Sequence, residues 1–142
     1  MFKSIKGKRV LITGATGGMG VVMTALFAEY GARLGLQYRK NHAEAKRLLA
    51  SVREEVGEAE IFQADLLGAP ARKNLVETFK KKFGGIDVLI NNAGAEYDHI
   101  DFRSLDEKSW QKTFDLNAKA PFFLSGEVFD SMKDQGGGRI IN

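Results

Sequence analysis

The chain has 142 residues, of which 44% are hydrophobic and 27% are charged, a composition typical of one soluble globular domain. Its net charge of +3 comes from interspersed acidic and basic residues, which argues against a nucleic-acid partner. It has no cysteine for a disulfide or thiolate metal site, and no apolar run approaches the ~20 residues of a membrane span. We therefore expect one domain over residues 1–142, located in the cytoplasm, with no metal site and no membrane contact.

The first predicted unit is a strand, a glycine-rich turn and a helix. The apolar run from Arg9 to Thr13 is typical of a parallel strand that is covered on both faces. Four glycines follow within seven residues, and an apolar helical pattern then runs from Gly18 to Tyr30, where Gly31 ends the helix. The buried face of this helix is expected to consist of Val21, Val22, Ala25, Leu26 and Ala28.

This glycine-rich turn has the pattern of a phosphate-binding site. A helix that begins directly after a strand aims backbone N–H groups and the positive end of its dipole at an anion. Gly14 permits the sharp turn, Gly18 leaves room for a pyrophosphate, and Gly20 lets the helix pack closely. A purely structural turn is the alternative. The residues predicted to contact a nucleotide here are Gly14, Thr16, Gly17, Gly18, Met19 and Gly20.

A second strand is predicted from Arg33 to Tyr38, and its end bears on the choice of cofactor. Enzymes that prefer NAD place an acidic residue there to bind the ribose 2′-hydroxyl, and this segment has none. Arg39 can instead bind a 2′-phosphate through two charge-assisted hydrogen bonds. We therefore predict a preference for NADP(H) over NAD(H). The alternative is that Arg39 and Lys40 only begin a solvated loop.

A second helix is predicted over residues 41–56. Asn41 has the position of its N-cap, and Glu44, three residues later, can reach back to it. Gly57 is expected to end the helix.

A short third strand from Glu60 to Gln63 is followed by Asp65 and Leu66. Taken alone, this aspartate is better explained as a loop or capping residue than as a ligand contact. Pro70 fits the first turn of a third helix, which is expected to end near Phe83.

The fourth predicted strand, Ile86 to Ile90, leads into the tetrapeptide Asn91-Asn92-Ala93-Gly94. Asparagine side chains bond to local backbone groups and tolerate unusual backbone dihedrals, so a purely structural turn is one interpretation.

A long helix is predicted over residues 105–134, starting at a capping box formed by Ser104 and Glu107. Its apolar residues occur on more than one side, so we expect the sheet on one side and a neighbouring helix or a second subunit on the other. Pro121 has no N–H group, so the carbonyl of Asn117, four residues earlier, loses its helical partner. A fifth strand begins at Arg139.

Two motifs in register, Thr13-Gly14-x-x-x-Gly18-x-Gly20 and Asn91-Asn92-Ala93-Gly94, together resemble the short-chain dehydrogenase/reductase family, most closely its 3-oxoacyl-[acyl-carrier-protein] reductases. The resemblance covers essentially the whole chain but only the N-terminal half of a family member. It implies an α/β fold: a Rossmann-type, doubly wound parallel sheet with strand order 3-2-1-4-5 in three αβα layers, truncated after the start of the fifth strand. It also implies a nicotinamide dinucleotide at the carboxyl ends of the strands.

The resemblance also implies roles for individual residues. Asp65 corresponds to the acid that accepts a hydrogen bond from the adenine amino group. Asn117 corresponds to the catalytic asparagine, whose backbone carbonyl holds a water in the proton relay. The cofactor contacts implied outside the glycine turn are Tyr38, Arg39, Asp65, Leu66, Asn92, Ala93 and Gly94.

Three of the four catalytic residues of the family have no counterpart in this sequence. The family's serine and its Tyr-x-x-x-Lys pair would follow Asn142, and none of the tyrosines here has a lysine four residues later. Because hydride transfer needs a matching proton transfer, we expect the chain alone to be inactive. It is then a truncated reductase, part of a longer protein, or a half-domain that binds a nucleotide or a partner without catalysis. The expected assembly is a homo-oligomer through helix 105–134, or a complex with a chain that supplies the missing half.

Overall fold

A computed structural model describes residues 5–54, 58–95 and 101–142. Its first half contains β1 (Arg9–Ile12), α1 (Gly18–Glu29), β2 (Arg33–Tyr38), α2 (His42–Arg53), β3 (Ala59–Gln63) and α3 (Ala69–Phe83). Its second half contains β4 (Val88–Ile90), a 3₁₀ turn (Phe102–Ser104), α4 (Glu107–Phe114), a π-helical segment (Asp115–Lys119), α5 (Ala120–Asp134) and β5 (Arg139–Ile141).

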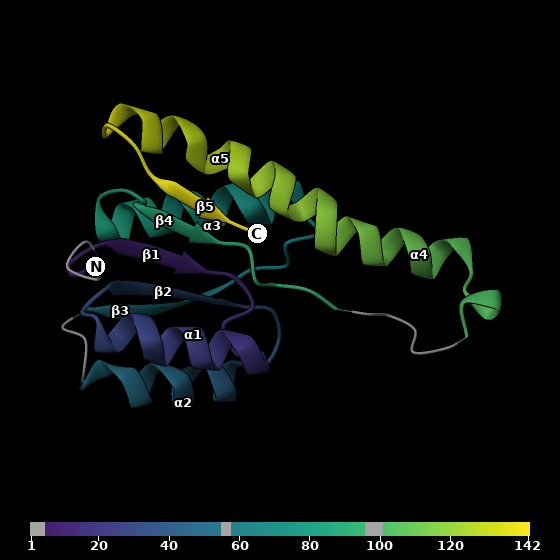
Figure 1. The fold of residues 1–142 in the computed structure, drawn as a ribbon, viewed down its shortest axis with the longest axis horizontal. Helices are drawn as coiled ribbons and strands as arrows, with labels where there is room; N and C mark the ends of the chain where they lie inside the picture. The colour runs from purple at the N-terminus through teal and green to yellow at the C-terminus, as the bar shows by residue number, and fades with distance from the viewer. Residues whose placement is uncertain (1–4, 55–57, 96–100) are drawn as a thin grey trace.

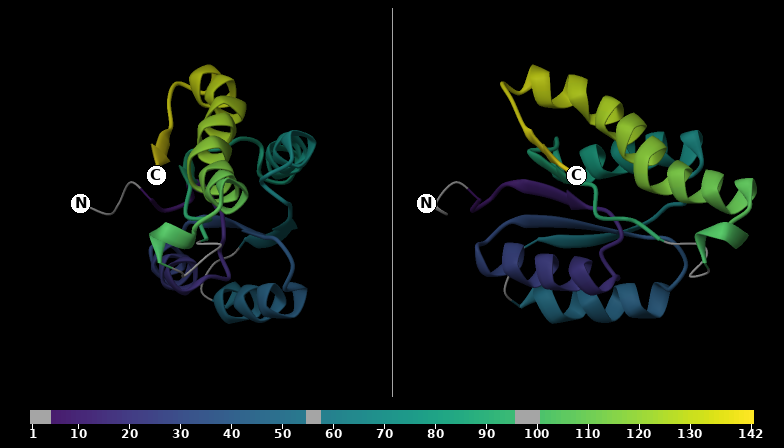
Figure 2. Two further views of the ribbon diagram at one scale, coloured as in Figure 1. Left: turned by 90° about the vertical axis from the view of Figure 1, so that its right-hand side faces the viewer. Right: turned by 45° about the vertical axis from the view of Figure 1, so that its right-hand side comes forward.

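The five strands form one parallel sheet with the order β3-β2-β1-β4-β5, which confirms the predicted doubly wound α/β topology. The central strand β1 pairs with β2 on one side and β4 on the other, with Val10 opposite both Leu34 and Val88. Figures 1 and 2 show α1 and α2 on one face of the sheet and α3 and α5 on the other, which gives three layers.

The core is divided into two halves by the sheet. Successive side chains of a strand point to opposite faces, so Val10 and Ile12 pack towards α1 and α2 whereas Leu11 packs towards α3 and α5. All three are fully buried. A strand covered on both faces has no polar side, which is why its sequence is continuously apolar.

The predicted buried face of α1 is wrong except at Ala28. The buried residues of the helix are instead Gly20, Thr24 and Ala28, and the Thr24 hydroxyl donates to the Gly20 carbonyl at 2.7 Å. Apolar residues occur on every side of this helix, so their spacing does not show which side meets the sheet. Small residues do so because they allow the closest approach. The residues predicted to be buried that are exposed are Val21, Val22, Ala25 and Leu26.

Of the two predicted N-caps, one is confirmed and one is wrong. Asn41 caps α2, since its Oδ1 accepts from the Glu44 N–H at 3.1 Å and its Nδ2 donates to Glu44 Oε2 at 2.8 Å. The cap of α4 is Asp106 rather than Ser104, because Ser104 belongs to the 3₁₀ turn that precedes the helix. The predicted end of the second helix at Val56 and Gly57 lies outside the described residues.

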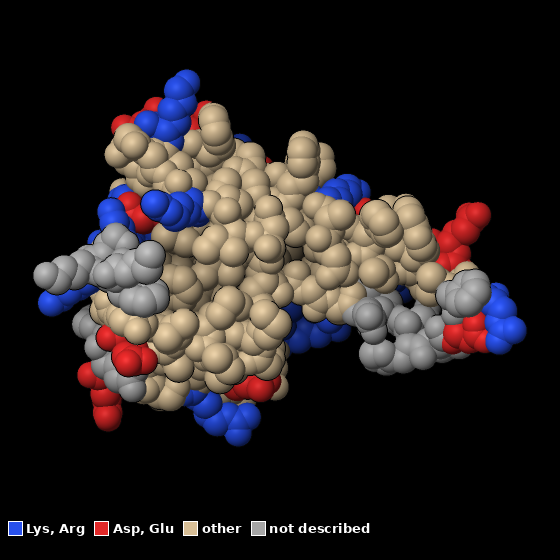
Figure 3. All heavy atoms as spheres, viewed as in Figure 1, with Lys and Arg blue, Asp and Glu red and all other residues tan. Residues whose placement is uncertain are grey.

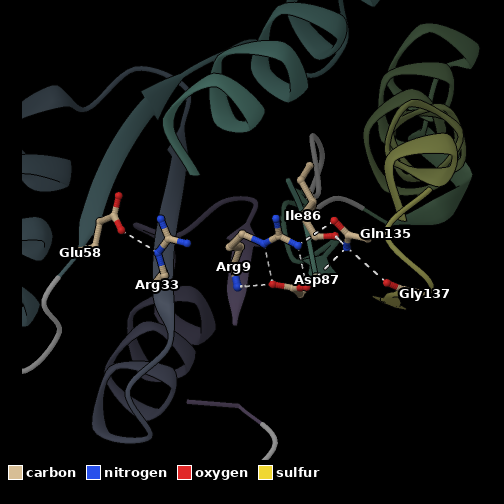
Figure 4. A network of polar contacts seen from close by, with 7 residues as sticks. All are labelled: Arg9, Arg33, Glu58, Ile86, Asp87, Gln135 and Gly137. Atoms are coloured by element: carbon tan, nitrogen blue, oxygen red, sulfur yellow. Dashed lines mark hydrogen bonds and ion pairs between the residues drawn. The ribbon is translucent and has the colours of Figure 1, made fainter. Parts of the chain in front are cut away.

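A network centred on Arg9 and Asp87 holds the amino end of the sheet (Figure 4). Arg9 Nε and Nη2 donate to the two Asp87 carboxylate oxygens at 2.7 and 2.9 Å, and the Arg9 backbone N–H donates to the same carboxylate at 2.8 Å. Arg9 Nη2 also donates at 2.7 Å to the Oε1 of Gln135, the residue directly after α5. These hydrogen bonds hold the pKa of the Asp87 carboxyl group below its ordinary value. The network therefore joins β1, β4 and α5 at one point.

Candidate functional site

The two sequence motifs meet in space at the carboxyl ends of β1 and β4. The Asn92 side-chain amide donates to the carbonyls of Thr13 and Gly14 at 2.9 and 3.0 Å. The Ala93 N–H donates to Thr13 Oγ1 at 3.0 Å, and that hydroxyl in turn donates to the Ile90 carbonyl at 3.1 Å. The glycine turn and the Asn-Asn-Ala-Gly segment therefore form one hydrogen-bonded unit.

Three glycines of the turn have different surroundings. Gly14 has a φ of +61°, and a Cβ atom there would lie 2.8 Å from Ala93 Cα. A Cβ at Gly20 would lie 2.4 Å from the Gly14 carbonyl oxygen, so the close approach at Gly20 is to the turn itself. A Cβ at Gly18 would meet nothing within 4 Å. Gly14 and Gly20 thus shape the turn, while Gly18 leaves open space above it.

Gln37 is a site residue that the sequence analysis missed. Its side chain is only 2% exposed, and its Oε1 accepts from the Gly14 N–H at 2.8 Å while its Nε2 donates to the Ala64 carbonyl at 2.7 Å. It therefore joins the glycine turn to the end of β3. The available signal was an amide near the end of a strand whose other residues are largely apolar, since a buried amide needs hydrogen-bond partners.

A cavity of about 410 Å³ lies above the carboxyl ends of the strands and gathers most of the predicted cofactor residues. Within the described parts of the chain, no side chain caps the N-terminus of α1, whose N-cap Gly17 lines this cavity. The first-turn N–H groups can therefore bond to water or a ligand. The predicted residues that line the cavity are Gly14, Thr16, Gly17, Gly18, Met19, Tyr38, Arg39, Leu66, Asn92, Ala93 and Gly94.

Two predicted cofactor residues do not line this cavity. Gly20 is buried beneath the turn. Asp65 is exposed, and its Oδ1 accepts from the Leu67 N–H at 3.1 Å, an arrangement that stabilises the local turn. The structure thus supports Gly20 in shaping the site, while the contact of Asp65 with adenine stays a prediction.

Asn117 lies in the π-helical segment between α4 and α5, and Figure 1 shows α4 extending beyond the carboxyl edge of the sheet. Its side-chain amide donates to the carbonyls of Ala95 and Thr113 at 2.9 and 2.8 Å. A Cβ at Gly94 would lie 2.6 Å from Asn117 Oδ1, so the asparagine lies directly against the predicted cofactor segment. π-Helical turns are frequent at functional sites. The role of the Asn117 backbone carbonyl, which Pro121 cannot bond, stays a prediction.

Charged groups span the π-helical segment. The Asp115 carboxylate accepts from Gln111 Nε2 at 2.9 Å and from Lys119 Nζ at 3.2 Å. These hydrogen bonds hold the pKa of Asp115 below its ordinary value, so the carboxylate is ionised at neutral pH. The ion pair joins the first residue of the segment to its last.

Asn117 also lines a second cavity of about 420 Å³, together with Ala95, Thr113, Phe114 and Ala118. Because Ala95 belongs to the lining of both cavities, the two spaces adjoin. Asn117 therefore stands where a molecule in the second cavity would meet a ligand in the first.

Within residues 5–54, 58–95 and 101–142, no three His, Asp or Glu residues are placed to bind a metal ion. The same part of the chain has no helix with the length and apolar character needed to cross a membrane.

Comparison of the sequence with known proteins gives a consistent family. Residues 8–142 match a family model described as short chain dehydrogenase. An uncharacterized oxidoreductase of Thermotoga maritima is 36% identical over 98% of this chain and 54% of that protein. A 3-oxoacyl-[acyl-carrier-protein] reductase of Synechocystis sp. is 34% identical over 93% of this chain and 53% of that protein. The chain spans about half the length of the curated relatives it matches.

Solved structures agree in fold and carry two different cofactors. The NADH-dependent reductase A1-R′ in complex with NAD superposes with a TM-score of 0.88 at 33% identity, covering 99% of this chain and 60% of that chain. A metagenomic short-chain oxidoreductase in complex with NADP superposes with a TM-score of 0.89 at 27% identity, covering 98% of this chain and 62% of that chain.

Proposed function

The chain belongs to the short-chain dehydrogenase family, and on this basis we propose that it is the cofactor-binding part of an oxidoreductase that interconverts a carbonyl and an alcohol. One observation carries the proposal: Asn92 ties the glycine turn to the Asn-Asn-Ala-Gly segment at the edge of an open cavity. The bound nicotinamide ring would supply the hydride transfer. The protein supplies the cradle, and relatives with the same fold bind NAD or NADP.

The arrangement of the cavity supports a dinucleotide rather than a mononucleotide. It extends from Tyr38 and Arg39, after β2, across the N-terminus of α1 to Gly94 and Ala95, after β4. In doubly wound sheets such a crevice binds the two halves of a dinucleotide on either side of the central strand. The adenosine half would lie towards Arg39, and the nicotinamide half would lie towards Asn117.

Asn117 is proposed to take part in proton transfer. Its side chain is fixed by two hydrogen bonds to backbone carbonyls, which leaves its amide unable to turn towards a substrate without losing them. We propose that the backbone carbonyl holds a water, because Pro121 has no N–H to donate to it in the α-helical register. In this proposal the asparagine orients a water for the proton relay, and other groups exchange the proton with the substrate.

We also propose that NADP(H) is preferred over NAD(H). Arg39 is exposed and lines the cavity, and the segment after β2 offers no carboxylate that would bind a ribose 2′-hydroxyl or repel a 2′-phosphate. The solved relatives include both an NAD complex and an NADP complex, so the preference depends on Arg39 in this chain.

Titration of the chain with NADPH and NADH tests the proposed cofactor binding and the proposed preference for NADP(H). We expect NADPH to bind more tightly, and Arg39→Ala to weaken NADPH by about tenfold or more, since a charge-assisted hydrogen bond contributes about 1.5–3 kcal/mol. NADH affinity should not change. Arg47→Ala is the matched control, because Arg47 is also exposed but does not line the cavity. Equal affinities, or a preference that Arg39→Ala leaves intact, would contradict the role of the 2′-phosphate.

The outward face of α4 and α5 is proposed to be covered by protein, either a second copy or a chain that completes the fold. Trp110 and Phe114 stack at 4.0 Å and are about half exposed, and Phe122 and Phe129 on α5 are 73% and 59% exposed. Figure 3 shows charged side chains mostly at the rim of the face that carries α1, β5 and α5, with few in its middle. Exposed aromatic side chains gathered on neighbouring helices favour association.

Light scattering tests this assembly. We expect a solution mass above 15.7 kDa, and we expect Phe129→Glu to lower it without loss of helix content, because a charge in an apolar interface is costly. Val22→Glu is the control, since Val22 is 67% exposed on α1, away from α4 and α5. A monomer at all concentrations would contradict the proposal, as would an equal effect of the two substitutions.

A further inference from the structure

Arg72 is a cation at a core position of α3. Its side chain is 4% exposed, on the side of α3 that also carries the buried residues Leu75, Val76 and Phe79. Among the residues that the structure describes, no Asp or Glu forms an ion pair with it. A buried guanidinium without a carboxylate partner is unusual, because a charge taken out of water needs strong compensating interactions.

The compensation comes from one loop and one ring. Arg72 Nη1 donates to the Leu66 carbonyl at 2.6 Å and to the Leu67 carbonyl at 3.2 Å. The guanidinium carbon lies 5.4 Å from the centre of the Phe123 ring on α5, within the range of a cation–π interaction. Arg72 Nε is buried and has no hydrogen-bond partner among the described residues. An apolar side chain would fill this position without an unpaired donor. The stabilisation that Arg72 provides therefore comes mainly from its hydrogen bonds to the two loop carbonyls.

This loop, residues 64–67, forms part of the wall of the candidate cofactor cavity. Ala64 and Leu66 line the cavity. The loop is held at its start by Gln37, which donates to the Ala64 carbonyl, and at its far end by Arg72. The Gln37 contact comes from within the sheet and the Arg72 contact from α3, so the two residues hold the loop from different layers of the fold.

We propose that Arg72 is a positioning residue that sets loop 64–67 against the adenosine half of the dinucleotide. It does not line the cavity, so it acts on affinity through the backbone of Leu66 and Leu67. The inference rests on the proposed function, because it assumes that the adenosine half lies beside this loop. It predicts that loss of Arg72 weakens one half of the cofactor and spares the other.

The test uses Arg72→Met, which keeps an apolar stem of similar length but removes the charge and the donors. Two quantities are measured: hydrogen exchange of the backbone amides in residues 64–68, and affinity for each half of the cofactor. The probes are 2′-phospho-ADP-ribose for the adenosine half and reduced nicotinamide mononucleotide for the other half. Lys73→Met is the matched control, since Lys73 is the exposed neighbour on the same helix and loses the same charge.

We expect Arg72→Met to speed exchange in residues 64–68 and to weaken 2′-phospho-ADP-ribose by about tenfold, the size expected for a lost charge-assisted hydrogen bond. Reduced nicotinamide mononucleotide should bind as it does to the unaltered chain, and Lys73→Met should change none of these quantities. A general loss of stability would weaken both halves alike, so the selective loss separates positioning from a merely structural role.

Two results would overturn the inference while leaving the proposed function intact: unchanged loop exchange, or equal weakening of the two cofactor halves. If the unaltered chain bound neither half, the proposed function would fail and the inference with it. Should Arg72→Met not fold, Arg72→Gln replaces it, because the shorter amide is neutral and cannot reach both carbonyls. Arg72→Gln is expected to speed exchange in residues 64–68 and to weaken 2′-phospho-ADP-ribose, both by less than Arg72→Met. If it did neither, the inference would also be overturned.

Discussion

Replacing Gly20 with alanine is expected to destabilise the fold by about 3 kcal/mol, the upper part of the range for overpacking. In an ordinary helix the same change stabilises by about 1 kcal/mol. Here the new Cβ would lie 2.4 Å from the Gly14 carbonyl oxygen and 2.7 Å from that of Ala15. Gln37 and Asn92 hold the backbone at Gly14, so the turn cannot move away at low cost. Urea unfolding at neutral pH measures the change.

Gly18→Ala is the control for this prediction, because it makes the same chemical change two residues earlier in the same helix. A Cβ at Gly18 meets nothing within 4 Å, so the free energy of unfolding should fall little or rise by up to about 1 kcal/mol. NADPH affinity should nevertheless decrease, since the Cβ projects into the space proposed for the pyrophosphate. Equal destabilisation by the two substitutions would show that crowding of the turn is not the cause.

Replacing Asp87 with alanine is expected to lower the free energy of unfolding by about 3 kcal/mol at neutral pH. The carboxylate accepts three hydrogen bonds from Arg9, and both side chains are 18% exposed, so its loss leaves a largely buried cation without its partner. The matched control is Glu58→Ala. The Arg33–Glu58 pair at the same end of the sheet (Figure 4) is 34% exposed on each side, and we expect a loss of about 1 kcal/mol or less. Equal losses at the two sites would contradict this account.

The Asp87 network also predicts how stability depends on pH. Hydrogen bonds from Arg9 lower the pKa of Asp87 in the folded state, so this carboxylate stabilises the fold fully above its unfolded pKa of about 3.9. That contribution is lost as the pH falls through the lower folded pKa. In Asp87→Asn, the free energy of unfolding should therefore decrease less between pH 5 and pH 2 than it does in the unaltered chain. Parallel curves for the two proteins would contradict the assignment.

Local signals in the sequence were sufficient for the framework of the fold. A sharp turn at Gly14 was expected from its place after an apolar strand, and Gly14 has a positive φ there. Gly84, which ends α3 in the left-handed conformation, follows the predicted end near Phe83. Asn41 and Glu44 form the predicted cap. Each of these depends on steric or hydrogen-bonding preferences that act within a few residues, so a pattern of residue types carries the information.

The meeting of the two motifs followed from the strand order that the family resemblance implied, because that order makes β1 and β4 neighbours with their carboxyl ends at one edge of the sheet. The individual contacts did not. The hydrogen bond from Asn92 to the Gly14 carbonyl depends on the register of β1 with its neighbours on both sides. The same is true of the link that Gln37 makes between this turn and Ala64. Register is decided by packing over the whole sheet, so no local pattern reports it.

Tertiary structure alone decided which side of α1 is buried, where α4 begins, and how Asn117 is held. The apolar residues of α1 leave several sides equally suitable, and contact with the sheet selected the one with small residues. Ser104 and Asp106 are both competent caps, and the 3₁₀ turn before α4 selected Asp106. Arg72 is the extreme case, since its charge predicts a surface residue, while the carbonyls of the loop just before α3 and the Phe123 ring on α5 stabilise it in the core. Sequence determined the elements and the place of the site through short-range preferences, whereas side-chain burial depended on partners that only the folded chain brings together.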